Sequence, residues 1–135
     1  MSLVDDCVKV LGKEAIILSK KETDAAFNML VQRFPFTRWG RIDWSQVKHS
    51  MKVNSVSGIL SLLIEQGRKT QDDVFILWDE AKLPAIKSKI YVILNHIEEV
   101  TLVSFDTWIF CPDDNYIVEF YHEGEITIGF SKKDK

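Results

Sequence analysis

Apolar and polar positions in the first third of the chain follow the period of an α-helix. Between residues 20 and 34, apolar side chains recur at i, i+3, i+4 and i+7, at Phe27, Leu30, Val31 and Phe34. Ser19 and Glu22 have the spacing of a capping box, and Pro35 ends the pattern. We therefore predict a helix over residues 20–33.

Three other segments are predicted to be helical. Residues 56–63 have apolar side chains at the same spacing, and Gly67 stands where a left-handed residue ends a helix. Leu83-Pro84 is expected to open a third helix, because proline is tolerated in the first turn. Its apolar stripe would comprise Ile86, Ile90, Ile93, Leu94 and Ile97. A short helix is also expected over residues 3–11.

The remaining pattern is that of β-strands. Residues 73–78 form a short, unbroken apolar run, which predicts a strand covered on both faces. From residue 101 onward, turn sequences separate three runs of β-forming residues, 101–111, 116–121 and 125–130, which predicts an antiparallel meander. One apolar alternation in the last two runs comprises Tyr116, Val118, Phe120, Ile126, Ile128 and Phe130. Glu119 and Thr127 fall on the other face, which we predict to meet water.

These elements predict an α/β (α+β) fold, with N-terminal helices packed on a sheet that ends in a three-stranded antiparallel meander. A chain of 135 residues with 46% hydrophobic content suits one domain over residues 1–135. Its apolar stretches are shorter than the ~20 residues of a membrane helix, and its start lacks the pattern of a signal peptide. Two cysteines are too few for a disulfide framework, so we expect a cytoplasmic protein. The short apolar stretches predict no membrane partner.

Acidic residues are concentrated in the last third of the chain. Residues 1–69 carry a formal charge of +4 and residues 70–135 a charge of −7, against −3 for the whole chain. The segment 98–130 contains no Lys or Arg, and its acids are Glu98, Glu99, Asp106, Asp113, Asp114, Glu119, Glu123 and Glu125. Carboxylates without cationic neighbours in their own segment are expected to be solvated, and on one sheet they attract a basic partner.

No motif for a metal or a cofactor is present. His49, His96 and His122 form neither an i, i+4 pair nor a His-Glu-x-x-His arrangement. The scattered glycines assemble neither a dinucleotide fingerprint nor a P-loop. Asp113 and Asp114 are predicted to lie in a solvated turn rather than to converge on a cleft. We expect no metal, no cofactor and no catalytic residue.

Two other functional classes stay open at this point. Residues 33–48 mix basic and aromatic side chains that can hold phosphates and stack bases, namely Arg33, Phe34, Phe36, Arg38, Trp39, Arg41, Trp44 and Lys48. This loop would suit an RNA- or DNA-binding regulator, although a pI near 5.6 argues against nucleic acid. A small hydrolase would need His96 or His122 beside Cys111, whose apolar and acidic surroundings instead favour a buried structural thiol.

Several stretches resemble small immunity proteins of bacterial contact-dependent growth inhibition and polymorphic-toxin systems. They are Asp73-Val-Phe-Ile-Leu-Trp78, Leu83-Pro84, Ile86, Ser104-Phe-Asp-Thr-Trp108, Tyr116 to Phe130, and Phe34-Pro-Phe-Thr-Arg-Trp-Gly-Arg-Ile-Asp-Trp44. The resemblance implies a cytoplasmic protein that binds and blocks the toxic C-terminal domain of a sibling cell's effector, commonly a nuclease. It assigns no contact residues, because such inhibitors diverge together with their toxins.

The residues themselves agree with that class. Nuclease toxins bind phosphate and are commonly basic around their active sites, so a carboxylate surface raises the association rate while Tyr and Trp act as buried anchors. The predicted toxin-binding residues are Asp106, Trp108, Asp113, Asp114, Glu119, Tyr121, Glu123 and Glu125. The alternative is that these acids only keep a β-sheet soluble.

Overall fold

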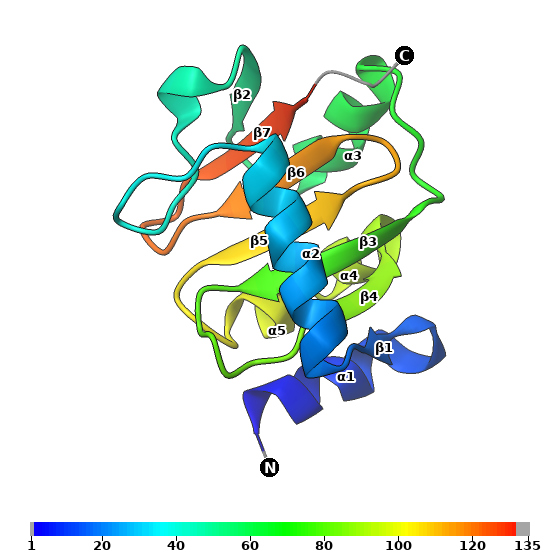
Figure 1. The fold of residues 1–135 in the computed structure, drawn as a ribbon. Helices are drawn as coiled ribbons and strands as arrows, with labels where there is room; N and C mark the ends of the chain where they lie inside the picture. The colour runs from blue at the N-terminus through cyan, green and yellow to red at the C-terminus, as the bar shows by residue number, and fades with distance from the viewer. Residues whose placement is uncertain (1, 132–135) are drawn as a thin grey trace.

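A computed structural model describes residues 2–131, which form a mixed α+β fold (Figure 1). The helices are α1 (Leu3–Leu11), α2 (Lys20–Arg33), α3 (Ser57–Glu65), α4 (Ile90–Asn95) and α5 (Ile97–Thr101). The strands are β1 (Ile16–Ile17), β2 (His49–Val53), β3 (Asp73–Trp78), β4 (Ile86–Lys89), β5 (Thr107–Cys111), β6 (Tyr116–Phe120) and β7 (Ile126–Phe130). They form one sheet in the order β1-β4-β3-β5-β6-β7-β2, in which every pair is antiparallel. The predicted fold class is confirmed.

The helices predicted over residues 3–11, 20–33 and from residue 56 are confirmed as α1, α2 and α3. The predicted capping box begins α2: Ser19 Oγ accepts a hydrogen bond from the Glu22 amide at 3.1 Å, and Glu22 Oε1 accepts one from the Ser19 amide at 2.9 Å. Gly67 follows α3 with a φ of 73°, the left-handed conformation that glycine adopts without strain. Within residues 2–131, no helix is long and apolar enough to cross a membrane.

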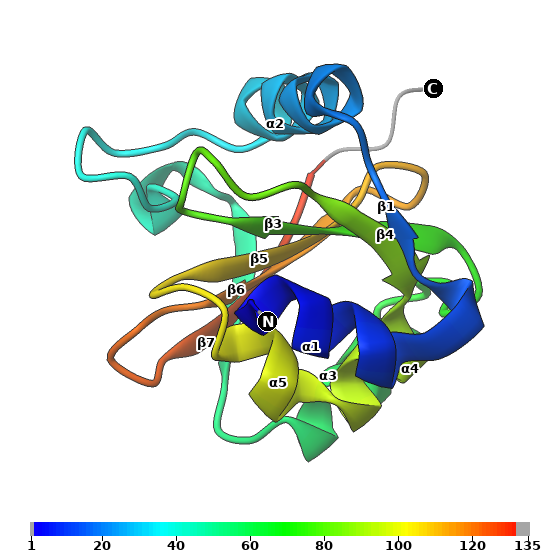
Figure 2. The same ribbon diagram turned by 90° about the horizontal axis from the view of Figure 1, so that it is seen from below.

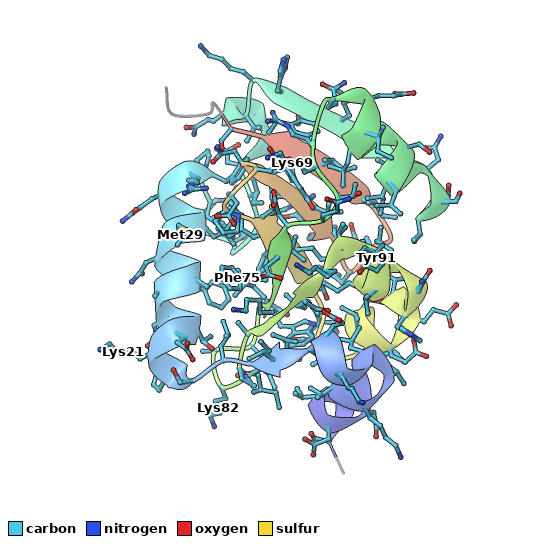
Figure 3. The ribbon with its side chains drawn as sticks, turned by 90° about the vertical axis from the view of Figure 1, so that its right-hand side faces the viewer. Lys21, Met29, Lys69, Phe75, Lys82 and Tyr91 are labelled. Carbon is cyan, nitrogen blue, oxygen red and sulfur yellow. The ribbon has the colours of Figure 1, made fainter. Side chains whose placement is uncertain are left out.

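Helices cover both faces of the sheet (Figure 2). α2 and the segment 34–47 pack on one face, whereas α1, α3, α4 and α5 pack on the other. Seen from the side, Phe75 of β3 points toward α2, and Tyr91 of α4 lies on the opposite side of the sheet (Figure 3). The central strands are therefore enclosed by two layers.

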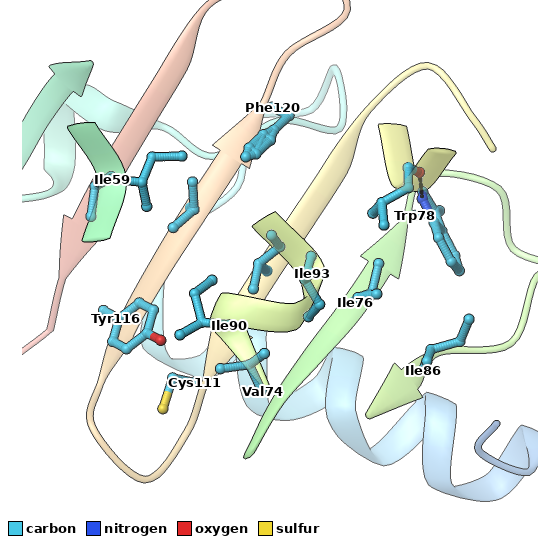
Figure 4. Close-up of a cluster of buried hydrophobic side chains, with 14 of the residues drawn as sticks. Ile59, Val74, Ile76, Trp78, Ile86, Ile90, Ile93, Cys111, Tyr116 and Phe120 are labelled. Carbon is cyan, nitrogen blue, oxygen red and sulfur yellow. Dashed lines mark hydrogen bonds between the residues drawn. The ribbon is translucent and has the colours of Figure 1, made fainter. Parts of the chain in front are cut away.

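The larger core lies between the sheet and the four helices (Figure 4). The predicted alternation of apolar residues in β6 and β7 is confirmed, since all six side chains face this core. Trp78 Nε1 donates a hydrogen bond to the carbonyl oxygen of Val100 at 3.0 Å, which ties α5 to β3. Cys7 and Cys111 are both buried here, as expected of structural thiols.

The prediction that the other face of the meander meets water is wrong. Glu119 is 1% exposed and Thr127 is 3% exposed, because this is the face on which α2 and residues 34–47 pack. A second core fills this layer, with Leu30, Phe34, Ile42, Leu77, Trp108, Phe110 and Ile117 among its members. One carboxylate of the acidic segment is therefore inside the protein.

The predicted helix from Leu83 is wrong over its first half. Residues 86–89 form β4, and α4 begins only at Ile90. In β4, Ile86 and Ser88 are buried and Lys87 and Lys89 are partly exposed, which is the period of a strand. The run predicted over 101–111 is also shorter, because α5 extends to residue 101 and β5 begins at residue 107.

Candidate partner-binding surface

The eight residues predicted to contact a partner do not form one surface. Asp106 precedes β5, whereas Asp113 and Asp114 follow it. The five residues of β5 rise about 3.3 Å each, so the two ends of the strand are about 17 Å apart. Because β6 runs back to the first end, that end carries Asp106, Tyr121, Glu123 and Glu125, and the second end carries Asp113 and Asp114.

Three of the predicted residues are buried: Trp108, Asp114 and Glu119. At Asp114 the predicted solvated turn is wrong, because its carboxylate accepts a hydrogen bond from the Lys69 amide at 2.5 Å and lies 4.0 Å from Arg68 Nη1. Its neighbour Asp113 is exposed, as predicted. Burial removes the three side chains from the molecular surface in this structure.

Glu119 holds the loop of residues 36–44 against the sheet. Its Oε1 accepts hydrogen bonds from Arg41 Nη2 at 2.7 Å and from Trp44 Nε1 at 2.9 Å. Its Oε2 accepts from the Ile42 amide at 3.1 Å and from Trp108 Nε1 at 3.0 Å. A buried carboxylate is stable only when a cation and several donors compensate its charge, and Glu119 has both. Its role here is to fix the loop.

The loop fixed by Glu119 turns back on itself as a short hairpin. Phe36 and Ile42 form a β-bridge, and the Thr37 amide donates a hydrogen bond to the carbonyl oxygen of Arg41 at 2.7 Å. Gly40 has a φ of 88°, so the turn requires its conformational freedom. The tip carries Trp39, whose side chain is 84% exposed. Trp39 was absent from the predicted contact residues, although its place beside Gly40 at the centre of the predicted loop was a signal of exposure.

Three loops meet at the first end of the sheet, and carboxylates join them. Asp79, which follows β3, accepts hydrogen bonds on Oδ1 from Ser104 Oγ at 2.6 Å and from the Asp106 amide at 3.0 Å. Asp106 in turn accepts a hydrogen bond on Oδ1 from the His122 amide at 2.8 Å, and His122 Nδ1 lies 3.0 Å from the same oxygen. The hydrogen bonds fix the β6–β7 turn relative to the loops before β5 and after β3.

We call this part of the surface the acidic end, and its carboxylates are Asp79, Glu80, Asp106, Glu123 and Glu125. Glu125 lies 3.6 Å from Arg41 Nη2 and 3.9 Å from Lys52 Nζ. The guanidinium of Arg41 also lies 3.8 Å from the centre of the Tyr121 ring. Phe105 is 77% exposed at the same end. Carboxylates and aromatic rings are thus presented together on loops held by hydrogen bonds.

Cys111 and His122, two of the groups considered for catalysis, are separated. Cys111 ends β5 and is buried at the second end of the sheet, whereas His122 lies at the acidic end. Burial raises the pKa of the Cys111 thiol to about 11, and burial raises that of Cys7 to about 11 as well. Both thiols are therefore protonated at neutral pH. Residues 2–131 contain no group of three or more His, Cys, Asp or Glu side chains that could hold a metal.

An α+β fold that presents carboxylates and exposed aromatic rings on fixed loops has the features of a protein that binds another protein. The comparison with known families identifies the kind of binding protein. The chain belongs to the family described as CdiI immunity protein EcoliA0-like, whose model matches residues 1–129. This confirms the resemblance to contact-dependent growth inhibition immunity proteins. A search of the curated proteins found no match.

Proposed function

We propose that this immunity protein neutralises its cognate toxin by binding the toxin domain at the acidic end, and that the toxin is a nuclease with a basic surface around its active site. Family membership supports the general role. The observation that carries the choice of surface is the gathering of five carboxylates from three loops at one end of the sheet. Binding of the immunity protein to the toxin domain is enough to block the toxin, so the immunity protein needs no catalytic residue. We expect the complex to form in the cytoplasm of a sibling cell.

Charge and rigidity both support this choice. Among residues 2–131, no Lys or Arg nitrogen lies within 4.0 Å of the carboxylates of Asp79 or Asp106. Their negative potential is therefore available to a basic partner and raises its association rate. The hydrogen bonds between the loops reduce the conformational entropy that binding would otherwise remove. The exposed rings of Trp39 and Phe105 supply apolar area for a partner to bury.

Charge reversal at the acidic end tests the proposal. We expect Glu80→Lys combined with Glu123→Lys to weaken binding of the cognate toxin domain by at least about tenfold, mainly through a slower association rate. The loss should shrink as salt is added, because both residues are exposed and salt screens their charge. Stopped-flow association and surface plasmon resonance measure the two rates.

Asp113→Lys is the matched control, since Asp113 belongs to the same acidic segment but is exposed at the other end of the sheet. We expect near wild-type association for this variant. Equal weakening by the control and by the double variant would show that net charge acts without any preferred surface. Unchanged binding by the double variant would exclude the acidic end.

A second candidate function, nucleic-acid binding, is favoured by one observation at the opposite end of the sheet. A groove of about 890 Å³ there is lined by Arg33, Lys48, His49 and Arg68 and, among residues 2–131, by no acidic residue. Two of the basic residues of the predicted nucleic-acid loop, however, already form hydrogen bonds within the protein. Arg33 donates hydrogen bonds to the carbonyl oxygen of Pro112 and to Asn115 Oδ1, and Arg41 is bound to Glu119.

We therefore expect the protein to bind a labelled single-stranded RNA no more tightly than the non-specific range, with a Kd of about 10⁻⁶ M or weaker at physiological salt. Fluorescence anisotropy over a salt series measures this affinity. Lys48→Glu is the informative variant because Lys48 is exposed in the groove. A tighter, strongly salt-dependent affinity that this substitution abolishes would favour the regulator over the toxin inhibitor.

A further inference from the structure

A second groove, of about 720 Å³, lies beside the exposed indole of Trp39. Its lining residues come from α2, from the hairpin of residues 36–42, from residues 78–81, and from Asp106 and Trp108. Its aromatic lining is closely packed. The rings of Phe27 and Phe36 both meet Trp108 edge to face, with centroids 6.4 and 5.4 Å from it. The groove therefore has an aromatic lining that is held in place by ring contacts.

Charge distinguishes this groove from an ordinary apolar hollow. Three carboxylates line it, those of Asp24, Asp79 and Asp106, and no Lys, Arg or His of the part of the chain that the structure describes does so. Asp24 pairs with Lys20 at 3.3 Å across one exposed helical turn. Asp79 accepts its hydrogen bonds on Oδ1, and within the described residues its Oδ2 accepts none. A charged acceptor is therefore left at the edge of an aromatic groove.

We propose that an arginine side chain of the toxin enters this groove, stacks on the indole of Trp39 and pairs with the carboxylate of Asp79. The inference rests on the proposed function, because it names one contact of the same complex. Arginine fits better than lysine, since its planar guanidinium stacks on aromatic rings and forms directional hydrogen bonds with carboxylates. A purely apolar side chain would leave the carboxylates of the groove desolvated and unpaired.

The protein prepares this contact before the toxin arrives. Glu119 fixes Arg41, Ile42 and Trp44, so the hairpin that carries Trp39 is held in place from its base. Trp39 itself is 84% exposed and has most of its surface still to bury. Tryptophan and arginine are the residues most often found where a few contacts carry most of the binding energy.

Affinity for the toxin domain, measured by isothermal titration calorimetry, tests the inference. Trp39→Ala and Asp79→Asn are each expected to weaken binding at least about tenfold. Asparagine keeps the oxygen that accepts from Ser104 and Asp106, so it removes the charge and leaves the loop contacts in place. Ile64→Ala is the control, since this residue is also apolar and exposed but lies on α3, across the sheet. We expect this control substitution to leave the affinity for the toxin domain unchanged.

A double-mutant cycle identifies the occupant. Each toxin arginine is replaced by alanine and combined with Trp39→Ala and with Asp79→Asn, and one arginine is expected to show losses well below additive with both. Coupling to a lysine or to an apolar side chain of the toxin instead would overturn the inference. Self-association of the immunity protein, detected by analytical ultracentrifugation and abolished by Trp39→Ala, would also overturn it. Weakening by the charge reversal at Glu80 and Glu123 but not at Trp39 or Asp79 would also overturn it, while the proposed function stood. A toxin domain that fails to bind the wild-type protein would remove the proposed function itself.

Discussion

Replacing Glu119 by alanine is expected to lower the free energy of unfolding by about 3–5 kcal/mol, the usual effect of removing one partner of a buried ion pair. The substitution leaves the indole N–H groups of Trp44 and Trp108 and the amide of Ile42 without their acceptor, and it leaves Arg41 without its nearest counter-ion. Urea denaturation followed by tryptophan fluorescence measures the change.

Two further variants show whether the effect belongs to the buried carboxylate. Glu119→Gln keeps a side chain of the same shape and one oxygen acceptor, so we expect a loss between those of the wild-type protein and the alanine variant. Glu123→Ala removes an exposed carboxylate from the β6–β7 turn and should change stability by less than about 0.5 kcal/mol. If the free energy of unfolding of Glu119→Ala lies within about 1 kcal/mol of the wild-type value, Glu119 does not anchor the hairpin.

Gly129→Val is expected to cost about 3 kcal/mol, at the upper end of the usual effect of adding carbon atoms to a well-packed core. A Cβ atom at Gly129 would lie 2.5 Å from Cζ3 of Trp44 and 3.5 Å from Cγ2 of Ile117. β7 cannot move away, because it pairs with β6 on one side and β2 on the other. The hydrogen bond from Trp44 to Glu119 holds the indole in place. Circular dichroism should show a Tm lower by roughly 10 °C.

The Trp44→Ala background separates crowding from any intrinsic effect of valine in the strand. Without the indole, the added side chain has room, so the loss caused by Gly129→Val should fall by at least about 1 kcal/mol. Strictly additive losses from the two substitutions would mean that Trp44 does not restrict this position.

The period of apolar residues was enough to predict the fold class and the face on which each residue of β6 and β7 lies. It was not enough to predict whether that face is covered. Glu119 was assigned to the correct face, but the groups that enclose it, Arg41 and Ile42, are 78 and 77 residues away in sequence. An acidic segment without its own cations was read as solvated, although distant segments supply its partners.

The misassigned helix has a similar cause. The isoleucines at positions 86 and 90 are four residues apart, which fits one face of a helix and also the same face of a strand. Pairing of β4 with β3 and β1 decides between them, and pairing is a tertiary property. Edge strand β2 lacks a strong alternation and was not predicted at all.

The candidate site was predicted in part for the same reason. Asp106, Tyr121, Glu123 and Glu125 do gather at one end of the sheet. Asp79 lies beside Asp106 only because β3 pairs with β5, and the sequence alone did not indicate that order. Trp39 reaches the same region through a hairpin fixed by a carboxylate far along the chain.

The arrangement around Glu119 separates the residues that hold the hairpin in its fold from the residues that the hairpin exposes. The residues that bind Glu119, namely Arg41, Ile42 and Trp44, stand at the base of the hairpin, and residues 38–40 stand at its tip. Substitutions at Arg38 and Trp39 leave the anchoring contacts intact, whereas the turn requires glycine at position 40. If the toxin binds the tip as proposed, a lineage can alter which toxin it recognises through changes at these two positions, without first accumulating mutations that restore folding.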